Sequence, residues 1–429
     1  MFSSDTYIQR RRKLKEQLGS GLILFIGNRE SPVNFRANAY RFHQDASFLY
    51  YWGLDFPGLS AVIDIDDDRE LILGNDFTVD DIMWMGPQVS MEEWAGQCGA
   101  HEALPSDQLK PILDAADRRA QPVHYLPPYR TDTLLNLEAL TGIPRQDINS
   151  SASRELIHAV VQQRLVKSEE EVRELETAVS VTKEMFDLAM ELTEPDLFEY
   201  EVIAWAEGLA MSRNSRPAHN FIFTTRGERL HGHTHNRKMA AGDLVVMDAG
   251  VESAMGYASD VTRSFPVAKR FSDMQKEIYQ IVLRANESAI EKMAPGVPFR
   301  DIHLHAASVV TDGLQQMGLM KGPLTDSVEQ GAHALFFPHG IGHPLGLEIH
   351  DLESLGEDFV GYNSEFKRDQ QFGLSNLRFA RPLETGMVMT VEPGIYFIPD
   401  LIQSWRSQGM AKAFICFDKL DEFLGFGGI

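Results

Sequence analysis

Three histidines concentrate in one short segment, residues 337–351, which reads FPHGIGHPLGLEIHD. His339, His343 and His350 lie there among glycines and prolines, which permit close backbone approach and fix turns. A helix interior tolerates few glycines, and a buried strand contains few histidines, so neither element explains the segment. Histidine binds metals and transfers protons near neutral pH. We therefore favour a functional site over a loop whose histidines are only hydrogen-bonded.

Two aspartates stand at the edges of apolar runs. Asp248 ends the run 243–248 (DLVVMD), and Asp260 begins the run 260–266 (DVTRSFP). Burying a bare carboxylate is costly, so each must be capped, paired or metal-bound. Alternate residues of a strand share a face, which predicts Asp260, Thr262 and Ser264 on one face and Val261 and Phe265 on the other. Two strands joined by a short connection would hold Asp248 and Asp260 side by side. Close carboxylates repel unless they share a proton or a cation, which predicts an acid/base dyad or a metal site.

A third carboxylate, Glu392, has a similar setting in GMVMTVEPGIY, where a glycine and an apolar strand precede it and a Pro-Gly turn follows. A cap or a turn would explain any one of these motifs alone. Together with His343, they form an oxygen-rich set without a thiolate. Such a set suits Mn, Co, Fe or Zn in paired sites and disfavours a structural zinc or copper site. Metals held ~3.5–4 Å apart by bridging carboxylates generate a nucleophile from water at neutral pH.

These residues must be positioned by a larger framework. Alternating helix and strand signals predict an α/β domain over the first ~150 residues. The pattern turns helical from 153 to about 192, with Ser168 as an N-cap before three glutamates. We expect domains at residues 1–155 and 156–429. The expected elements of the first domain are a helix at 5–18, strands at 21–27, 60–65 and 70–74, a helix at 107–118 and a strand at 122–126.

Composition restricts the partners and the compartment. A chain of 429 residues is expected to form two or more domains. The net charge of -22 argues against nucleic acid or an anionic membrane as a partner. Two cysteines imply no disulfide framework and fit a reducing cytoplasm. The sequence shows neither a signal peptide nor a run of ~18 apolar residues, so we expect a cytoplasmic protein.

The four ordered motifs resemble those of the pita-bread metallopeptidases, which include methionine aminopeptidase, prolidase and Xaa-Pro aminopeptidase. The resemblance implies an α/β amino-terminal domain plus an α+β pita-bread catalytic domain. It identifies Asp248, Asp260, His343 and Glu392 as metal ligands. It therefore implies two divalent metal ions as cofactors, with Mn as the first choice and Co or Zn as alternatives.

The same resemblance assigns three more histidines. His231, His339 and His350 match the non-ligand histidines that bind substrate and move protons. His350, or His231 across the cleft, would hydrogen-bond the developing oxyanion. Glu392 would also transfer a proton from the nucleophile to the leaving nitrogen. His339 would contact the substrate near the scissile bond.

The segment 42–54, FHQDASFLYYWGL, resembles the signature of the aminopeptidase P amino-terminal domain. It favours a Xaa-Pro aminopeptidase that acts on proline-containing peptides and forms a homo-oligomer, either a dimer or a tetramer. Longer prolidases carry a similar domain, so a Xaa-Pro dipeptidase is the alternative. A catalytically incomplete binding protein on the same fold is a second alternative. A creatinase-like amidinohydrolase fits less well, because it lacks these metal ligands.

The sequence differs from the family pattern at one motif. A second metal glutamate is expected in a segment like Gly-Ile-Arg-Ile-Glu, whereas residues 425–429 read GFGGI. The resemblance implies that this arginine and glutamate would follow Ile429. We therefore expect that the carboxy-terminal end of the catalytic domain is missing and that the activity of residues 1–429 depends on this ligand. Residues 361–381 are expected to form an inserted surface loop near the cleft.

Overall fold

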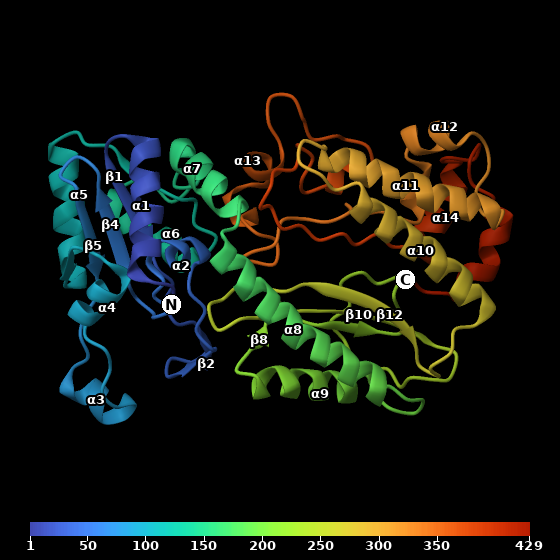
Figure 1. The fold of residues 1–429 in the computed structure, drawn as a ribbon, viewed down its shortest axis with the longest axis horizontal. Coiled ribbons are helices and arrows are strands. Elements are labelled where there is room, and N and C mark those ends of the chain that lie inside the picture. The colour runs from blue at the N-terminus through green and yellow to red at the C-terminus, as the bar shows by residue number, and fades with distance from the viewer. The chain divides into compact units, whose positions relative to one another are not determined.

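Two compact units make up the chain, which a computed structural model describes over residues 1–429 (Figure 1). Unit 1 comprises Met1–Arg164 together with the short segment Leu352–Phe359. Unit 2 comprises Leu165–Asp351 and Val360–Ile429. None of the helices combines the length and the apolar character that crossing a membrane requires.

Unit 1 is built on a five-stranded sheet with the order β6-β5-β4-β1-β7. Strand β4 is central, and its neighbour β1 pairs antiparallel with β4 and parallel with β7. The apolar runs 21–27, 60–65 and 70–74, which were predicted to be strands, correspond to β1, β4 and β5. These three strands are buried along most of their length. A separate two-stranded hairpin joins β2 to β3. The strand bounds are β1 Leu22–Ile26, β2 Pro32–Phe35, β3 Asn38–Ala39, β4 Ser60–Asp64, β5 Arg69–Leu73, β6 Glu102–Leu104 and β7 Val123–Tyr125.

Helices surround this sheet. The first ends at Gly19, which adopts the left-handed conformation that favours glycine at a helix end. Every residue of the aromatic helix α2 is buried, so this stretch serves packing. The helical bounds are α1 Ser4–Leu18, α2 Ala46–Trp52, α3 Val79–Met85, α4 Met91–Cys98, η1 Ser106–Gln108, α5 Leu109–Arg118, α6 Thr131–Thr141, α7 Arg154–Leu165 and η3 Glu353–Leu355.

Unit 2 begins with a capped helix. The Ser168 side chain accepts a hydrogen bond from the Glu171 amide, and Glu171 accepts one from the Ser168 amide. This cap explains why the predicted helical stretch 153–192 is interrupted after Leu165. The bounds are α8 Glu169–Leu192, α9 Glu199–Ser212, α10 Asp273–Glu291, α11 Phe299–Gln316, α12 Leu324–Glu329, η2 Ala332–Leu335, η4 Leu374–Asn376, α14 Pro399–Gln408 and η5 Phe417–Phe423. Helix α13 Glu357–Gly361 begins in unit 1 and ends in unit 2.

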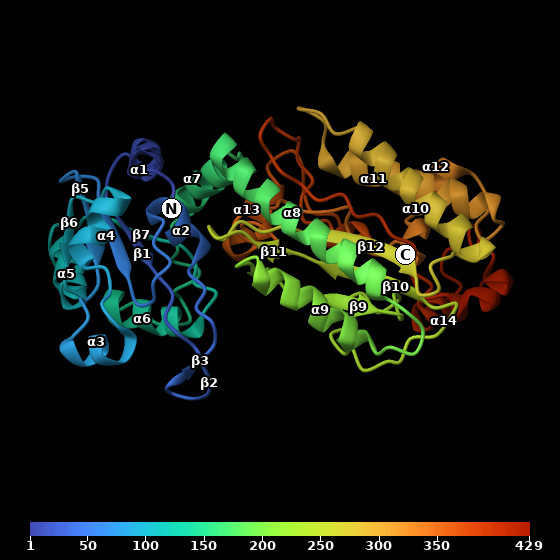
Figure 2. The ribbon, with the colours of Figure 1, turned by 60° about the horizontal axis from the view of Figure 1, so that its bottom comes forward.

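The strands of unit 2 are β8 Arg216–Pro217, β9 Ile222–Thr224, β10 Leu244–Ala249, β11 Val251–Glu252 and β12 Val261–Pro266. They form a three-stranded sheet of order β12-β10-β9 and a two-stranded sheet of β11 and β8. Helices α8 and α9 run side by side and share one apolar core with these strands (Figures 1 and 2). Helices α10 and α11 form a second packed pair.

Side-chain alternation determines which face of β10 presents polar side chains to a functional site. Val245 and Met247 belong to the core shared with α8 and α9. Because neighbouring side chains in a strand point to opposite faces, Asp248 faces away from that core. On β12, Val261 and Phe265 pack against the same core, as the alternation predicted. The opposite, polar face of the sheet is therefore available for a functional site.

One predicted strand is irregular. Residues 388–392 run antiparallel to residues 341–345, through hydrogen bonds from Leu345 N to Val388 O (3.0 Å), Thr390 N to His343 O (2.9 Å) and Glu392 N to Ile341 O (2.8 Å). The pairing yields only one isolated bridge, between Pro344 and Met389, because the His343 amide donates to Thr390 Oγ1 (2.9 Å) and not to the Thr390 carbonyl. The predicted surface loop 361–381 also differs from expectation. Several of its apolar side chains are buried, and Asn376 Nδ2 donates to Pro338 O (3.2 Å).

Candidate metal centre

Asp248 and Asp260 lie on the polar face of the β10–β12 pair. In the register of these strands Asp248 is opposite Thr262, and Asp260 directly precedes β12. Their carboxylates are thus diagonal neighbours on one face, within reach of each other. The close approach needs Gly250, where an added Cβ would lie 1.7 Å from Ser259 O. The predicted juxtaposition of the two aspartates is therefore present.

The ladder between residues 341–345 and 388–392 brings His343 and Glu392 to the same place. His343 Nε2 lies 3.2 Å from Asp260 Oδ2 and 3.3 Å from Glu392 Oε1. His343 Nδ1 lies 3.0 Å from Pro344 O, and because a carbonyl only accepts, Nδ1 carries the proton. Nε2 is thereby turned toward the carboxylates. Gly342 permits this path, since a Cβ there would lie 2.1 Å from Thr390 O.

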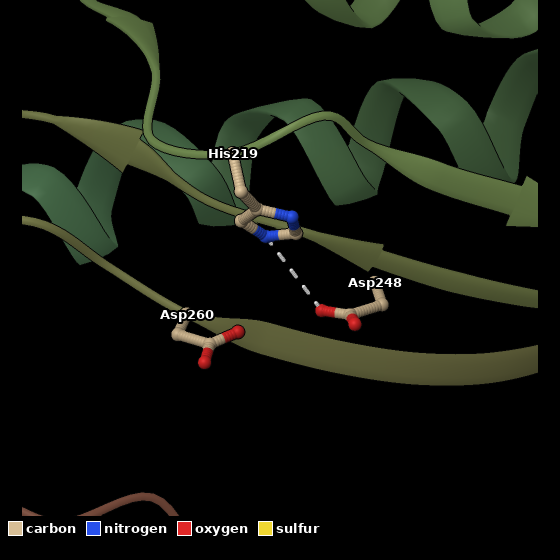
Figure 3. A group of neighbouring side chains, drawn as sticks. All are labelled: His219, Asp248 and Asp260. Carbon is tan, nitrogen blue, oxygen red and sulfur yellow. Dashed lines mark ion pairs between the residues drawn. The ribbon is translucent and has the colours of Figure 1, made fainter. Parts of the chain in front are cut away.

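A second histidine, His219, lies at the site without having been predicted. It follows β8, and its Nε2 is 3.8 Å from Asp248 Oδ1 (Figure 3). Ligand atoms of His219, Asp248 and Asp260 all lie within 4.8 Å of one another. No motif marks His219, and its only sequence signal is a position just before the apolar residues of β9.

The electrostatics of the cluster are those of crowded carboxylates. Burial raises the pKa of Asp248 well above its usual value, and the charges of Asp260 and Glu392 raise it further. Burial also opposes ionisation of Asp260, but its hydrogen bond with His343 outweighs this, so the pKa of Asp260 is lowered. Burial alone would lower the pKa of His343, yet its hydrogen bonds to Asp260 and Glu392 raise the pKa to about 10.

This donor set fits a divalent cation. Asp248 Oδ1 and His219 Nε2 are both buried without a hydrogen-bond partner. Unpaired buried acceptors are costly, and so is mutual repulsion of carboxylates. A cation held by oxygen and imidazole donors would remove both costs. Burial lowers the pKa of His219, which favours its neutral, metal-binding form.

The remaining predicted histidines occupy different surroundings. The His350 ring lies 4.3 Å from that of His343, centroid to centroid. His339 Nδ1 donates to Gly340 O (2.8 Å), so Nε2 accepts from the Tyr396 hydroxyl (3.1 Å). His231 is exposed, and its charge contributes to lowering the pKa of His339 after the larger effect of burial. Tyr396, to which sequence reasoning gave no role, thus links His339 to the site.

The chain matches two known families. Residues 173–417 match Metallopeptidase family M24, and residues 7–124 match the aminopeptidase P N-terminal domain. The chain belongs to metallopeptidase family M24. M24 peptidases use divalent metal ions, in agreement with the donor set described above.

Individual M24 proteins resemble the chain over most of its length. A Xaa-Pro aminopeptidase of Haemophilus influenzae is 31% identical over 92% of this chain and 87% of that protein. A Xaa-Pro dipeptidase of Homo sapiens is 28% identical, covering 98% of this chain and 85% of that protein. The structure of Zn-substituted Escherichia coli aminopeptidase P in complex with product matches with a TM-score of 0.78. It is 28% identical and covers 94% of this chain and 89% of that one.

These matches confirm three predictions. The resemblance to the pita-bread metallopeptidases is confirmed. The fold class, an α/β amino-terminal domain plus an α+β pita-bread catalytic domain, is confirmed as well. The prediction of a metallopeptidase is also confirmed.

Proposed function

We propose that this M24 protein is a Xaa-Pro aminopeptidase, which hydrolyses the peptide bond between an amino-terminal residue and a following proline. The observation that carries the proposal is the convergence of Asp248, Asp260, His343 and Glu392 in a chain that also matches the aminopeptidase P N-terminal domain. The aminopeptidase relatives support the same activity.

In this proposal Asp248, Asp260, His343 and Glu392 hold two divalent ions. Manganese is our first assignment because carboxylate donors suit it, and cobalt and zinc are the alternatives. When bound, such a metal pair supplies a nucleophile from water at neutral pH and polarises the scissile carbonyl. The chain's own residues then orient the substrate and manage its protons.

Glu392 is the proposed proton carrier from the nucleophile to the leaving nitrogen. Its Oε1 accepts a hydrogen bond from Thr390 Oγ1 (2.9 Å), which fixes the orientation of the carboxylate. Such a relay matters for this bond, because the amide nitrogen of proline carries no hydrogen and leaves only once it is protonated.

The three histidines that are not predicted ligands are assigned to the substrate. His350 packs on His343 and would donate to the developing oxyanion, a role that His231 would fill from the other side. His339, whose tautomer is set by Gly340 and whose Nε2 is held by Tyr396, would contact the substrate near the scissile bond.

A peptide panel tests the activity. We expect manganese- or cobalt-stimulated release of the first residue from Xaa-Pro-Yaa, with much slower cleavage of Xaa-Ala-Yaa and of the dipeptide Xaa-Pro. Cleavage of Xaa-Pro with sparing of the tripeptide would instead establish a Xaa-Pro dipeptidase, the candidate that the human relative favours. Less than one metal per chain and no hydrolysis would point to a binding protein.

Two further assignments accompany the activity. We propose that the protein works as a homo-oligomer, a dimer or a tetramer, which light scattering of the purified protein would test. We also propose a cytoplasmic location, in keeping with the presence of only two cysteines, both unpaired. Fractionation of the native host would test it.

A further inference from the structure

We propose that His219 is itself a ligand of the metal centre, so that this chain uses two imidazoles where its motifs assign one. The inference rests on the metal dependence of the proposed function and deepens it. The cluster of His219, Asp248 and Asp260, with ligand atoms within 4.8 Å of one another, is the observation that carries it (Figure 3).

The orientation of the His219 ring is that of a metal ligand. Its Nδ1 lies 3.0 Å from Asn220 O, and since the carbonyl can only accept, Nδ1 carries the proton. Nε2 therefore presents a lone pair, and it is buried without a hydrogen-bond partner. A ring held by a carbonyl at one nitrogen and bare at the other is the usual arrangement of metal-binding histidines. His343 is held in the same way by Pro344 O.

The atom facing His219 is also an unpaired acceptor. Asp248 Oδ1 is buried without a hydrogen-bond partner and lies 3.8 Å from His219 Nε2. This separation is too long for a hydrogen bond. Two bare acceptors pointed at each other repel, whereas a shared cation would satisfy both at once. Asp248 is a proposed metal ligand for independent reasons, so the same cation would serve both residues.

The backbone around His219 is fixed to the strand that carries Asp248. Ala218 N donates to Gly250 O (2.9 Å), just beyond β10. On the other side of His219, Ile222 of β9 is opposite Asp248 in the sheet register. His219 is thus held from both sides against the end of β10. A ligand needs such positioning, because a loosely held imidazole loses entropy on binding.

A second imidazole changes which metals the centre prefers. Imidazole nitrogen favours cobalt and zinc, whereas carboxylate oxygen suits manganese. His219 should therefore contribute more to the affinity for Co²⁺ than to the affinity for Mn²⁺. Loss of the ring should cost at least about tenfold in Co²⁺ affinity, the lower bound found when only an outer partner of a ligand is removed.

The test is Co²⁺ binding to the full chain after chelation. Wild type, His219→Ala, His219→Gln and the control His233→Ala are titrated with Co²⁺ and with Mn²⁺ by calorimetry. The control removes an exposed imidazole from the β9–β10 connection, outside the ligand cluster. NMR of the Co²⁺ form then counts the strongly shifted imidazole N–H signals. Circular dichroism verifies folding, and the glutamine variant keeps a polar side chain of similar size.

We expect both His219 variants to lose one shifted N–H signal and at least about tenfold in Co²⁺ affinity, with a smaller loss for Mn²⁺. His233→Ala should match wild type. Unchanged signals and affinities in folded His219 variants would overturn the inference, while leaving the peptidase proposal intact if wild type binds metal and cleaves Xaa-Pro-Yaa. A wild-type chain that binds no Co²⁺ would overturn both.

Discussion

Buried histidines in unit 2 have pKa values that are shifted in opposite directions, although burial by itself lowers the pKa of each. His303 and His333 are fully buried, and burial lowers their pKa values to about 3 and about 4. His343 is almost as deeply buried, yet its pKa is raised to about 10. The difference lies in their partners. The ring nitrogens of His303 and His333 have no hydrogen-bond partner, whereas His343 Nε2 lies between two carboxylates.

The comparison teaches that burial alone does not mark a functional histidine. His303 and His333 lie 6.0 Å apart, centroid to centroid, in an aromatic environment that includes Phe337. Their neutral rings fill space like other aromatic side chains. His343 is our proposed metal ligand because two separate segments bring carboxylates to one of its ring nitrogens. Variants that remove a ring, a charge or a hydroxyl can test this distinction.

The largest contrast is expected between His343→Ala and His303→Phe. Removing His343 should lower kcat/KM on Xaa-Pro-Yaa by roughly 1,000-fold, or about 4 kcal/mol of transition-state stabilisation, because a proposed metal ligand is lost. His303→Phe should leave kcat/KM within about twofold at a temperature where the variant is folded. Steady-state kinetics with added Mn²⁺ measures both. Equal losses in the two variants would remove the distinction between core and site histidines.

Next in size is a buried charge next to His350. Lys167 Nζ lies 2.9 Å from Asp351 Oδ2, and both side chains are 1% exposed. Lys167→Met should reduce the free energy of unfolding by about 3–5 kcal/mol, because the buried Asp351 carboxylate loses the charge of Lys167. Urea unfolding measures the change. Adding Asp351→Asn should restore part of the loss, since the buried negative charge is then removed as well.

The control for this ion pair is the exposed pair of Lys183 and Asp187 on α8. Lys183→Met should leave the urea midpoint unchanged, because solvent screens exposed pairs. A drop as large as that of Lys167→Met would show that charge removal, and not burial of the partner, governs the stability.

The pH dependence of stability separates the two sets of histidines. His303 and His333 have pKa values below the ordinary 6.5 in the folded state, so the unfolded chain binds more protons in acid. Their contribution is therefore present above about pH 6.5 and is lost as the pH falls toward about 4 and 3. At pH 5 the loss from His303 alone should be about 2 kcal/mol, at about 1.4 kcal/mol per pH unit.

Urea unfolding of wild type and His303→Phe between pH 5 and pH 8 measures this effect. The variant should lose less stability on acidification than wild type, although it has the lower stability at pH 8 if the ring packs poorly. A steeper acid dependence in the variant would show that His303 binds a proton in the folded state.

The smallest effect is expected at the hydroxyl that holds His339. Tyr396→Phe removes the hydrogen bond to His339 Nε2, a neutral interaction of about 0.5–1.5 kcal/mol. We expect kcat/KM to fall by about three- to tenfold, from looser placement of His339. The matched control is Tyr125→Phe in unit 1, which loses a buried hydroxyl hydrogen bond to Ile148 O (2.9 Å). Its kcat/KM should not change.

Local patterns in the sequence predicted the elements that pair regularly. The alternation in residues 260–266 placed Val261 and Phe265 on the core face and Asp260 on the polar face, as β12 shows. Ser168 was recognised as a helix cap because its signal lies within one helical turn. Asp248, Asp260, His343 and Glu392 could be proposed together because each stands in a recognisable motif.

The remaining features depend on contacts between distant segments. His219 lies close to Asp248 only because β9 pairs with β10, and no sequence pattern near His219 predicts that contact. The apolar run before Glu392 predicts a regular strand, but the His343 amide of its partner segment donates to the Thr390 side chain, which leaves one isolated bridge. The unpartnered burial of His303 and His333 likewise arises from packing of α11 against η2. Hydrophobic periodicity depends on residues that are close in the sequence, so it cannot predict contacts between these distant segments.

The segment Leu352–Phe359 has a practical consequence for dividing the protein. It belongs to unit 1, where the Phe359 ring packs 5.3 Å from that of His158 and under the Arg154 guanidinium at 5.6 Å. Yet it lies inside the stretch 173–417 that matches family M24. A single cut after Arg164 would therefore strip this segment of its unit 1 partners. Unit 1 is thus made of two stretches of chain that are separated in the sequence by part of unit 2. A chimera that exchanges residues 1–164 must also exchange the eight residues Leu352–Phe359.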